Sequence, residues 1–460
     1  MSDPGSLEDG RLPSALQKPT SVAFSQSRQR GTRTVPAPRS CEPLSAETFR
    51  QHALKDILPY WYEHALDREH GGYIPQLDRQ WRVTDPSRKD IVPTTRLIYN
   101  FSQGQLLGGP AWCAEAARLG LDFFLNHFWD KEFGGWYWQV SREGAPREDA
   151  KATYGHAFAI LALSEFHRAF GSTTRPGSSQ ADLPAVADEA LRMAKSTFDL
   201  LEEHVYDPVY GGYRERFRRD WSRPSGPLRG RPAGHPDPVR TQNSQMHIVE
   251  ALLALFEASG EERYLARAVE LCQLMNDKLF DHEHGCLPEF FRDDWSDSPG
   301  ERGDPVEPGH QMEWAWLLLL VHAHRPEPLF LERAKQLADF ALRFGWDEKF
   351  GGFVTALTRT GEVVAPNKSA WQQCEAVLAT LWLWNQTGDE KYWVAFERAA
   401  RYCFAHVADR QHGGWFTSLE RENRPAEDQK GGPWKADYHP VKMCAEVSRL
   451  LASREHSPGT

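Results

Sequence analysis

The sequence predicts an all-α protein, an (α/α)6 barrel in which six helical hairpins form two concentric rings. Three observations support this prediction. A short glycine-containing motif occurs six times along the chain, an amphipathic helix precedes each copy, and a more apolar helix follows it. Together these patterns repeat one helical hairpin six times.

The repeated motif is an aspartate, three variable residues, a glycine, a second small residue and usually an aromatic residue. Glycine readily adopts positive φ, and aspartate bonds to the backbone of its own turn, so each copy predicts a helix end and a tight turn. The copies are DREHGGY (67–73), DKEFGGW (130–136), DPVYGGY (207–213), DHEHGCL (281–287), DEKFGGF (347–353) and DRQHGGW (409–415).

The helices on the two sides of the motif differ in character. Those before it have apolar residues near every 3.6 positions, as in 49–66 and 396–408, which is typical of an outer ring. Those after it begin at residues 96, 154, 243, 309, 371 and 437 and are more apolar, which is typical of an inner ring. An open solenoid would have polar capping repeats, whereas here the first and last units resemble the others.

Composition and charge exclude several other classes of protein. The 460-residue chain has a formal net charge of −10, which disfavours nucleic acid or an anionic membrane as a partner, and no apolar stretch reaches the length of a membrane span. Its seven cysteines include no CxxC pair and their odd number does not indicate a disulfide framework, so we expect a cytoplasmic protein. We also expect a monomer or homodimer. The composition of residues 1–43 predicts a disordered tail, which leaves 44–455 as a single barrel domain.

Polar and ionisable residues cluster where the six apolar helices begin. If these helices run the same way around a barrel, their first turns converge at one end and form a polar funnel. One glutamate could be a helix cap and one histidine a core residue, but six convergent sets with four histidines favour a functional site. The sets are Arg96 with Tyr99, Tyr154 with His156, Asn243 with His247 and Glu250, His310 with Glu313, Gln372 with Glu375, and Lys435 with Asp437 and His439.

Other kinds of site fit the sequence less well. There is no HExxH motif and the candidate ligands come from separate helices, so we expect no metal. A glycoside hydrolase with paired carboxylates is an alternative, because the helix starts offer Glu250, Glu313, Glu375 and Asp437. The histidines, however, suit proton transfer near neutral pH.

Four segments, RLIYNFS, NSQMHIVEA, GHQMEWAW and WKADYH, resemble the N-acylglucosamine 2-epimerase superfamily over about residues 44–452. The resemblance implies a cofactor-independent enzyme that acts on a free sugar as a 2-epimerase or an aldose–ketose isomerase. The segments are similar to more than one branch, and we expect a small neutral monosaccharide as substrate. A non-catalytic binding protein like renin-binding protein, which belongs to the same superfamily, is a further alternative.

The resemblance also implies a role for each residue of the funnel. His310 and His439 would be the general acid and base on either side of the C1–C2 region of the sugar, and Glu313 would orient His310 or assist proton movement. Arg96 would hold a sugar oxygen and stabilise negative charge. The remaining sugar contacts would come from Tyr154, Asn243, His247, Trp371 and Trp434.

The implied chemistry is coherent without a cofactor. The C1 aldehyde of an open-chain aldose acidifies the proton on C2, which a neutral histidine can remove to give a cis-enediolate. Arg96 and a protonated histidine would stabilise the negative charge of this intermediate. Return of the proton to the other face of C2 gives the epimer, whereas delivery to C1 gives the ketose.

Overall fold

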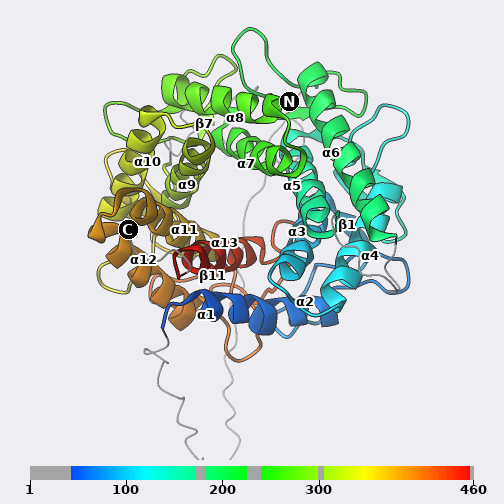
Figure 1. Cartoon of the computed structure of the whole chain (residues 1–460), viewed down its shortest axis with the longest axis horizontal. Coiled ribbons are helices and arrows are strands. Elements are labelled where there is room, and N and C mark those ends of the chain that lie inside the picture. The colour runs from blue at the N-terminus through cyan, green and yellow to red at the C-terminus, as the bar shows by residue number, and fades with distance from the viewer. Residues whose placement is uncertain (1–42, 172–181, 225–239, 299–304, 456–460) are drawn as a thin grey trace, which may run out of the picture. The chain divides into compact units, whose positions relative to one another are not determined.

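The computed structural model describes residues 43–171, 182–224, 240–298 and 305–455, and its helices form two concentric rings (Figure 1). Because α13 packs against both α11 and α3, the inner ring closes, which confirms the predicted (α/α)6 barrel. The tail predicted over 1–43 lies, apart from Pro43, outside the described residues. The inner ring consists of α3 (Ile91–Leu106), α5 (Thr153–Phe170), α7 (Gln242–Ser259), α9 (Pro308–His324), α11 (Ala370–Thr387) and α13 (Tyr438–Glu455).

The outer ring covers the inner one. Its helices bury one stripe, as α12 does with Tyr392 and Phe396, whereas α9 of the inner ring is buried on all sides for most of its length. None of the helices in the described part of the chain has both the length and the hydrophobicity needed to cross a membrane. The outer ring consists of α1 (Ala46–Gln51), η1 (His52–Ile57) and α2 (Leu58–His64), α4 (Trp112–His127), α6 (Leu183–His204), α8 (Glu262–Leu274) with η2 (Met275–Leu279), α10 (Pro328–Phe340) with η3 (Ala341–Gly345), and α12 (Glu390–Tyr402) with η4 (Cys403–Val407).

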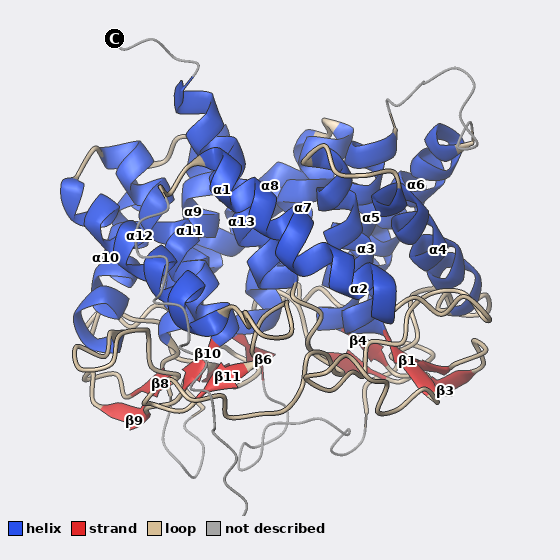
Figure 2. Cartoon of the chain, turned by 90° about the horizontal axis from the view of Figure 1, so that it is seen from below, coloured by secondary structure: helices blue, strands red, loops and turns tan. Residues whose placement is uncertain are grey.

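Short strands gather at one end of the barrel, in the loops that lead from each outer helix to the next inner helix (Figure 2). Most of the antiparallel pairs join the loops of successive hairpins, so this end of the barrel is held together around the first turns of the inner helices. The strands are β1 (Arg88–Asp90), β2 (Gln139–Ser141) and β3 (Pro146–Glu148), β4 (Lys151–Ala152) with β5 (Arg216–Phe217), β6 (Arg240–Thr241) with β7 (Phe290–Phe291), β8 (Ala356–Leu357) with β9 (Val363–Ala365), and β10 (Lys368–Ser369) with β11 (Ser418–Leu419).

The six copies of the motif form the predicted turns. In each copy the first glycine has a φ between 69° and 79°. The aspartate Oδ1 accepts a hydrogen bond from the N–H two residues further on, as Asp130 does from Glu132 at 3.1 Å. Most of these carboxylates are also paired with a basic residue close ahead of an inner helix. Lys151 Nζ, two residues before α5, lies 2.9 Å from Asp130 Oδ2, and Arg219 binds the same carboxylate.

Removal of one charge from a buried turn is expected to destabilise the barrel. Asp130→Asn leaves the buried Lys151 ammonium without its counterion, which costs about 3–5 kcal/mol in the free energy of unfolding. The matched control is Asp339→Asn, because Asp339 pairs with Lys391 where both side chains are nearly half exposed, and such pairs contribute about 0.2–1 kcal/mol. Urea denaturation of both variants measures the difference, and equal losses would contradict the structural role of the buried pair.

Candidate active site

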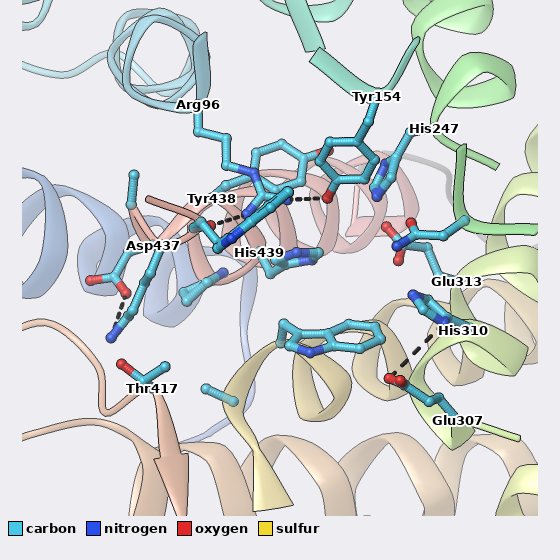
Figure 3. Close-up of a pocket in the computed structure, with 17 residues that line it drawn as sticks. Arg96, Tyr154, His247, Glu307, His310, Glu313, Thr417, Asp437, Tyr438 and His439 are labelled. Carbon is cyan, nitrogen blue, oxygen red and sulfur yellow. Dashed lines mark hydrogen bonds and ion pairs between the residues drawn. The ribbon is translucent and has the colours of Figure 1, made fainter. Parts of the chain in front are cut away.

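The first turns of the inner helices surround a cavity of about 300 Å³ (Figure 3). Five of the inner helices begin within one residue of the predicted positions, whereas α3 begins at Ile91 and places Arg96 in its second turn. The cavity is lined by all nine residues to which the family resemblance gave a role: Arg96, Tyr154, Asn243, His247, His310, Glu313, Trp371, Trp434 and His439.

His310 forms a close pair with a carboxylate that the sequence did not indicate. Its Nδ1 donates to Glu289 Oε2 at 2.8 Å, and both side chains are buried. Burial lowers the pKa of His310, but the charge of Glu289 and this hydrogen bond outweigh it and raise the pKa to about 9. His310 is therefore an imidazolium at neutral pH, and the carboxylate that bonds to its ring is that of Glu289 instead of Glu313, whose expected role stays a prediction.

His439 forms a second histidine–carboxylate pair, but its charge differs from that of His310. Its Nδ1 donates to Glu375 Oε1 at 2.6 Å. Burial lowers the pKa of His439, and the charges of Lys442 and Arg96 lower it further, well below its usual range. The position of His439 in the first turn of α13 acts in the same direction, because a helix N-terminus disfavours a cation. At neutral pH the His439 imidazole is therefore neutral.

A buried lysine lies among three glutamates at the base of the site. Lys442 Nζ is 3.1 Å from Glu250, 2.8 Å from Glu313 and 3.2 Å from Glu375, and we call these four residues the lysine cluster. Burial raises the pKa of Glu250, but the charge of Lys442 and the bond from His247 reverse this and lower it to about 2. The cluster thus supports His247 through Glu250 and His439 through Glu375.

Arg96 is held in one orientation. Its Nη1 donates to the Trp434 carbonyl and its Nη2 to the Tyr154 hydroxyl at 3.0 Å, and the guanidinium lies over the Phe158 ring at 4.4 Å. Its buried Nε has no hydrogen-bond partner among the described residues. This arrangement places a permanent positive charge in the cavity wall.

The other cavity residues provide flat and polar surfaces. The Trp371 ring lies 4.7 Å from the ring of His310 and 5.6 Å from that of His439, so it contacts both histidines. Trp434 is 51% exposed at the rim. The buried Oδ1 of Asn243 has no partner within the described part of the chain and is available to a ligand hydroxyl.

Not every polar residue at a helix start belongs to the cavity. His156 accepts a hydrogen bond from the Trp136 N–H through Nε2 at 3.0 Å and has a structural role next to a turn. Glu307, in contrast, lines the cavity and had not been predicted. Burial raises its pKa, the His310 charge opposes this and the Glu289 charge adds to it, which brings the pKa to about 7.

Among the described residues, three groups of side chains are close enough to hold a metal ion by distance alone: His247 with Glu250 and Glu313, Glu289 with Glu307 and His310, and Glu313 with Glu375 and His439. In the first and third groups the Lys442 ammonium already binds the carboxylates. In the second, Glu289 bonds to the His310 ring. Each group thus has protein partners of its own, and the expectation that no metal is needed stays a prediction.

A barrel that holds one protonated and one neutral histidine beside a fixed arginine at its open end has the groups for acid–base catalysis. Residues 72–443 match the family model described as N-acylglucosamine 2-epimerase (GlcNAc 2-epimerase). The chain belongs to this family, and it is an enzyme of the sugar epimerase and isomerase class.

Its relatives carry both activities. A D-mannose isomerase of Marinomonas mediterranea is 29% identical, over 89% of this chain and 98% of the relative. A cellobiose 2-epimerase of Bacteroides fragilis is 29% identical, over 87% and 99%. The solved cellobiose 2-epimerase of Bacillus thermoamylovorans has a TM-score of 0.78 at 26% identity, over 88% of this chain and 98% of that one.

A solved glycoside hydrolase of family 76 from Bacteroides thetaiotaomicron has a TM-score of 0.57 at 12% identity, over 90% of this chain and 99% of the other, and shares the fold alone. The glycoside hydrolase alternative is therefore not favoured.

Proposed function

We propose that this enzyme interconverts a free aldohexose with its C2 epimer or with the corresponding ketose, with His439 as the base and His310 as the acid. The observation that supports this most directly is the unequal charge of two histidines that contact the same tryptophan in one cavity. A base must be neutral before it removes a proton, and an acid must hold the proton that it donates.

In this mechanism the neutral imidazole of His439 removes the proton from C2 of the open-chain sugar. Arg96 and the imidazolium of His310 stabilise the negative charge that develops on the enediolate oxygens, together with the N-termini of the inner helices. Donation by His310 to the opposite face of C2 yields the epimer. Delivery by the protonated His439 to C1 yields the ketose.

The size of the cavity supports a small substrate. At about 300 Å³ it lies at the lower end of the range of about 300–1,000 Å³ found for small-molecule sites, which favours a monosaccharide of the mannose, glucose or fructose type. Tyr154, Asn243 and His247 are proposed to bind its hydroxyls, and Trp371 and Trp434 to contact its apolar faces. Glu313, which bonds to Lys442, is proposed to assist proton movement.

Incubation with sugars in deuterated water tests this function. D-mannose, D-glucose, D-fructose and cellobiose are incubated separately in metal-free buffer and followed by proton NMR. We expect deuterium to replace the C2 proton of at least one aldose. Mannose and glucose that interconvert identify an epimerase, whereas fructose formed from either identifies an isomerase. Absence of C2 exchange in every aldose would overturn the proposal.

A further inference from the structure

The two histidine–carboxylate pairs of the cavity differ in the other groups that bind the carboxylate. Besides His310, Glu289 accepts from the Gln242 side chain at 2.9 Å and from the Glu307 N–H at 3.4 Å. Both of these donors are neutral. Within the described part of the chain Glu289 has no lysine or arginine ion-pair partner, and the imidazolium of His310 is its counterion.

Glu375 is placed differently. The oxygen that accepts from His439 Nδ1 at 2.6 Å, Oε1, also lies 3.2 Å from Lys442 Nζ. A cation and a histidine thus share one carboxyl oxygen. A proton added to His439 would be repelled by the Lys442 ammonium, which already binds the same oxygen of Glu375.

Lys442 is fixed in this position from several sides. Its side chain is 1% exposed, and the two other glutamates of the lysine cluster bind the same ammonium. The ammonium also lies over the rings of Trp316 at 4.6 Å and Tyr438 at 5.0 Å. A lysine held this tightly cannot move away when His439 gains a proton.

We propose that Lys442 is the positioning residue that makes the two histidines unequal, because it competes with His439 for the Glu375 carboxyl group and repels a second proton on the ring. Its role in catalysis rests on the proposed function, in which His439 is the base. The charge of Lys442 is, after burial, the strongest influence that lowers the pKa of His439, in agreement with this geometry.

Other ionisable groups also surround the two side chains. His439 is faced by Glu375 from α11, Arg96 from α3, His247 from α7 and His310 from α9. Lys442 is faced by Glu250 from α7, Glu313 from α9, Glu375 from α11 and Tyr438 from its own helix. Because the charge of Lys442 also lowers the pKa of Glu250 and of Glu375, the effect of its removal on His439 is measured directly, by titration of the His439 ring.

Two variants test the proposal. Lys442→Gln removes the charge but retains a hydrogen-bond donor, and Lys442→Arg retains the charge. The pKa of His439 is measured by NMR titration of the histidine rings, and the acidic limb of the C2-exchange rate is measured against pH. Removal of an adjacent positive charge is expected to raise the pKa of His439 and move the acidic limb upward by about one pH unit or more. Lys442→Arg should retain the wild-type values.

An unchanged His439 titration in Lys442→Gln, or equal shifts in both variants, would overturn the proposal. If Lys442→Gln does not fold, Lys442→Gln combined with Glu250→Gln removes one charge of each sign and is titrated instead. The same rise in the pKa of His439 is expected there, because the lost cation shares Glu375 Oε1 with His439 and the lost anion does not. An unchanged titration of this double variant would equally overturn it.

The titration needs no turnover, so it separates this inference from the proposed function. A shifted His439 in an enzyme that exchanges no aldose would support the role of Lys442 and reject the function. C2 exchange in the wild type together with an unshifted His439 titration in Lys442→Gln would support the function and reject the role of Lys442.

Discussion

Replacement of His439 by asparagine is expected to reduce the rate of C2 proton exchange by about 10²–10⁴-fold, the usual contribution of a general base. The asparagine amide can reproduce the hydrogen bond from Nδ1 to Glu375, which is 2.6 Å long in the wild type. It has no counterpart of the Nε2 lone pair that would accept the proton. The variant therefore removes the base with little change to the lysine cluster.

The exchange rate is measured by loss of the C2 proton signal at saturating aldose in deuterated water. His406→Gln is the matched control, because His406 is exposed on η4 of the outer ring, away from the cavity. Retention of most of the wild-type rate by His439→Asn would assign the base role to another residue. A rate that falls equally in the control would indicate a general loss of structure.

The parts of the fold that depend on local sequence were predictable. The turn at Asp130 is made by contacts within a few residues, so the motif alone specified it. The inner helices were recognisable because burial on all sides requires a continuous apolar sequence. Contacts between distant residues were not predictable from these local patterns.

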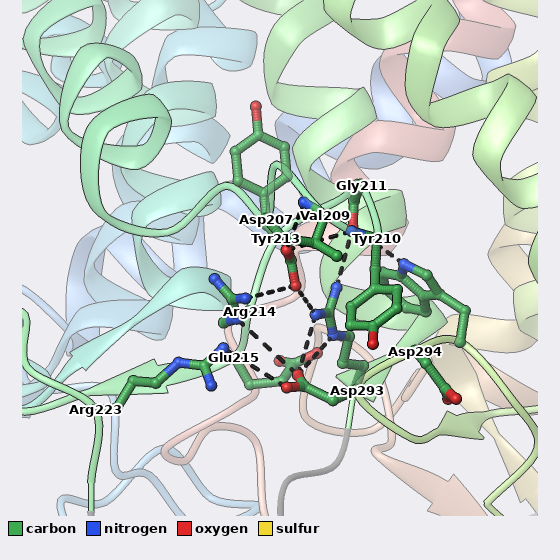
Figure 4. Close-up of polar contacts among 12 residues, drawn as sticks. Asp207, Val209, Tyr210, Gly211, Tyr213, Arg214, Glu215, Arg223, Asp293 and Asp294 are labelled. Atoms are coloured by element: carbon green, nitrogen blue, oxygen red, sulfur yellow. Dashed lines mark hydrogen bonds and ion pairs between the residues drawn. The ribbon is translucent and has the colours of Figure 1, made fainter.

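The ion pairs made by the turn aspartates show that contacts between distant residues are not evident from local patterns (Figure 4). Asp207 binds Arg214 at 2.6 Å and also Arg240, which in turn lies 3.0 Å from Asp293 of the next hairpin. The motif indicates the aspartate, but its partners lie outside the motif, at Arg214 and, two residues before α7, at Arg240. A buried aspartate needs such partners, yet the sequence does not say which arginine is near.

A second repeated turn in the loops could not be recognised from the sequence, for a related reason. Trp81, Trp221 and Trp295 have positive φ angles of 64°, 65° and 68°, which are unusual for bulky residues. Their indole N–H groups donate to carbonyl oxygens of neighbouring turns, at 2.7, 2.9 and 3.0 Å. The same turn position holds Gly144, Gly361 and Asn423 in the other hairpins, so the six copies share a conformation but not a residue type.

The site was predicted where residues lie at helix starts and missed where they do not. Glu289 lies in a loop, 21 residues before His310, and no periodicity connects them. Lys442 gave a stronger signal, since a lysine within an apolar inner helix must have a buried counterion. Its partners Glu250 and Glu313 are 192 and 129 residues away, so only the closed ring identifies them.

Replacement of Glu289 by glutamine is expected to move the basic limb of the pH–rate profile to lower pH. In the wild type, burial lowers the pKa of His310 but the Glu289 carboxylate raises it to about 9, so the acid keeps its proton up to about that pH. Without this carboxylate, burial lowers the pKa of His310 while the charges of Glu307 and Glu313 still raise it, so the pKa moves down from about 9 toward the ordinary value of about 6.5. The exchange rate at pH 7.5 should fall by up to about tenfold and recover in part toward pH 6.

The stability of the protein should change with a definite sign. A histidine whose pKa is raised on folding stabilises the native state below its unfolded pKa, and this contribution is lost as the pH rises through the folded pKa of about 9. The difference in free energy of unfolding between wild type and Glu289→Gln should therefore be large at pH 6 and shrink toward pH 9. Glu332→Gln, at an exposed position of α10, is the control and should leave both profiles unchanged. A Glu289→Gln enzyme that retains the wild-type basic limb would show that another group donates the proton, because among the described residues the next carboxylate, that of Glu307, lies 4.0 Å from the His310 ring nitrogen that Glu289 binds.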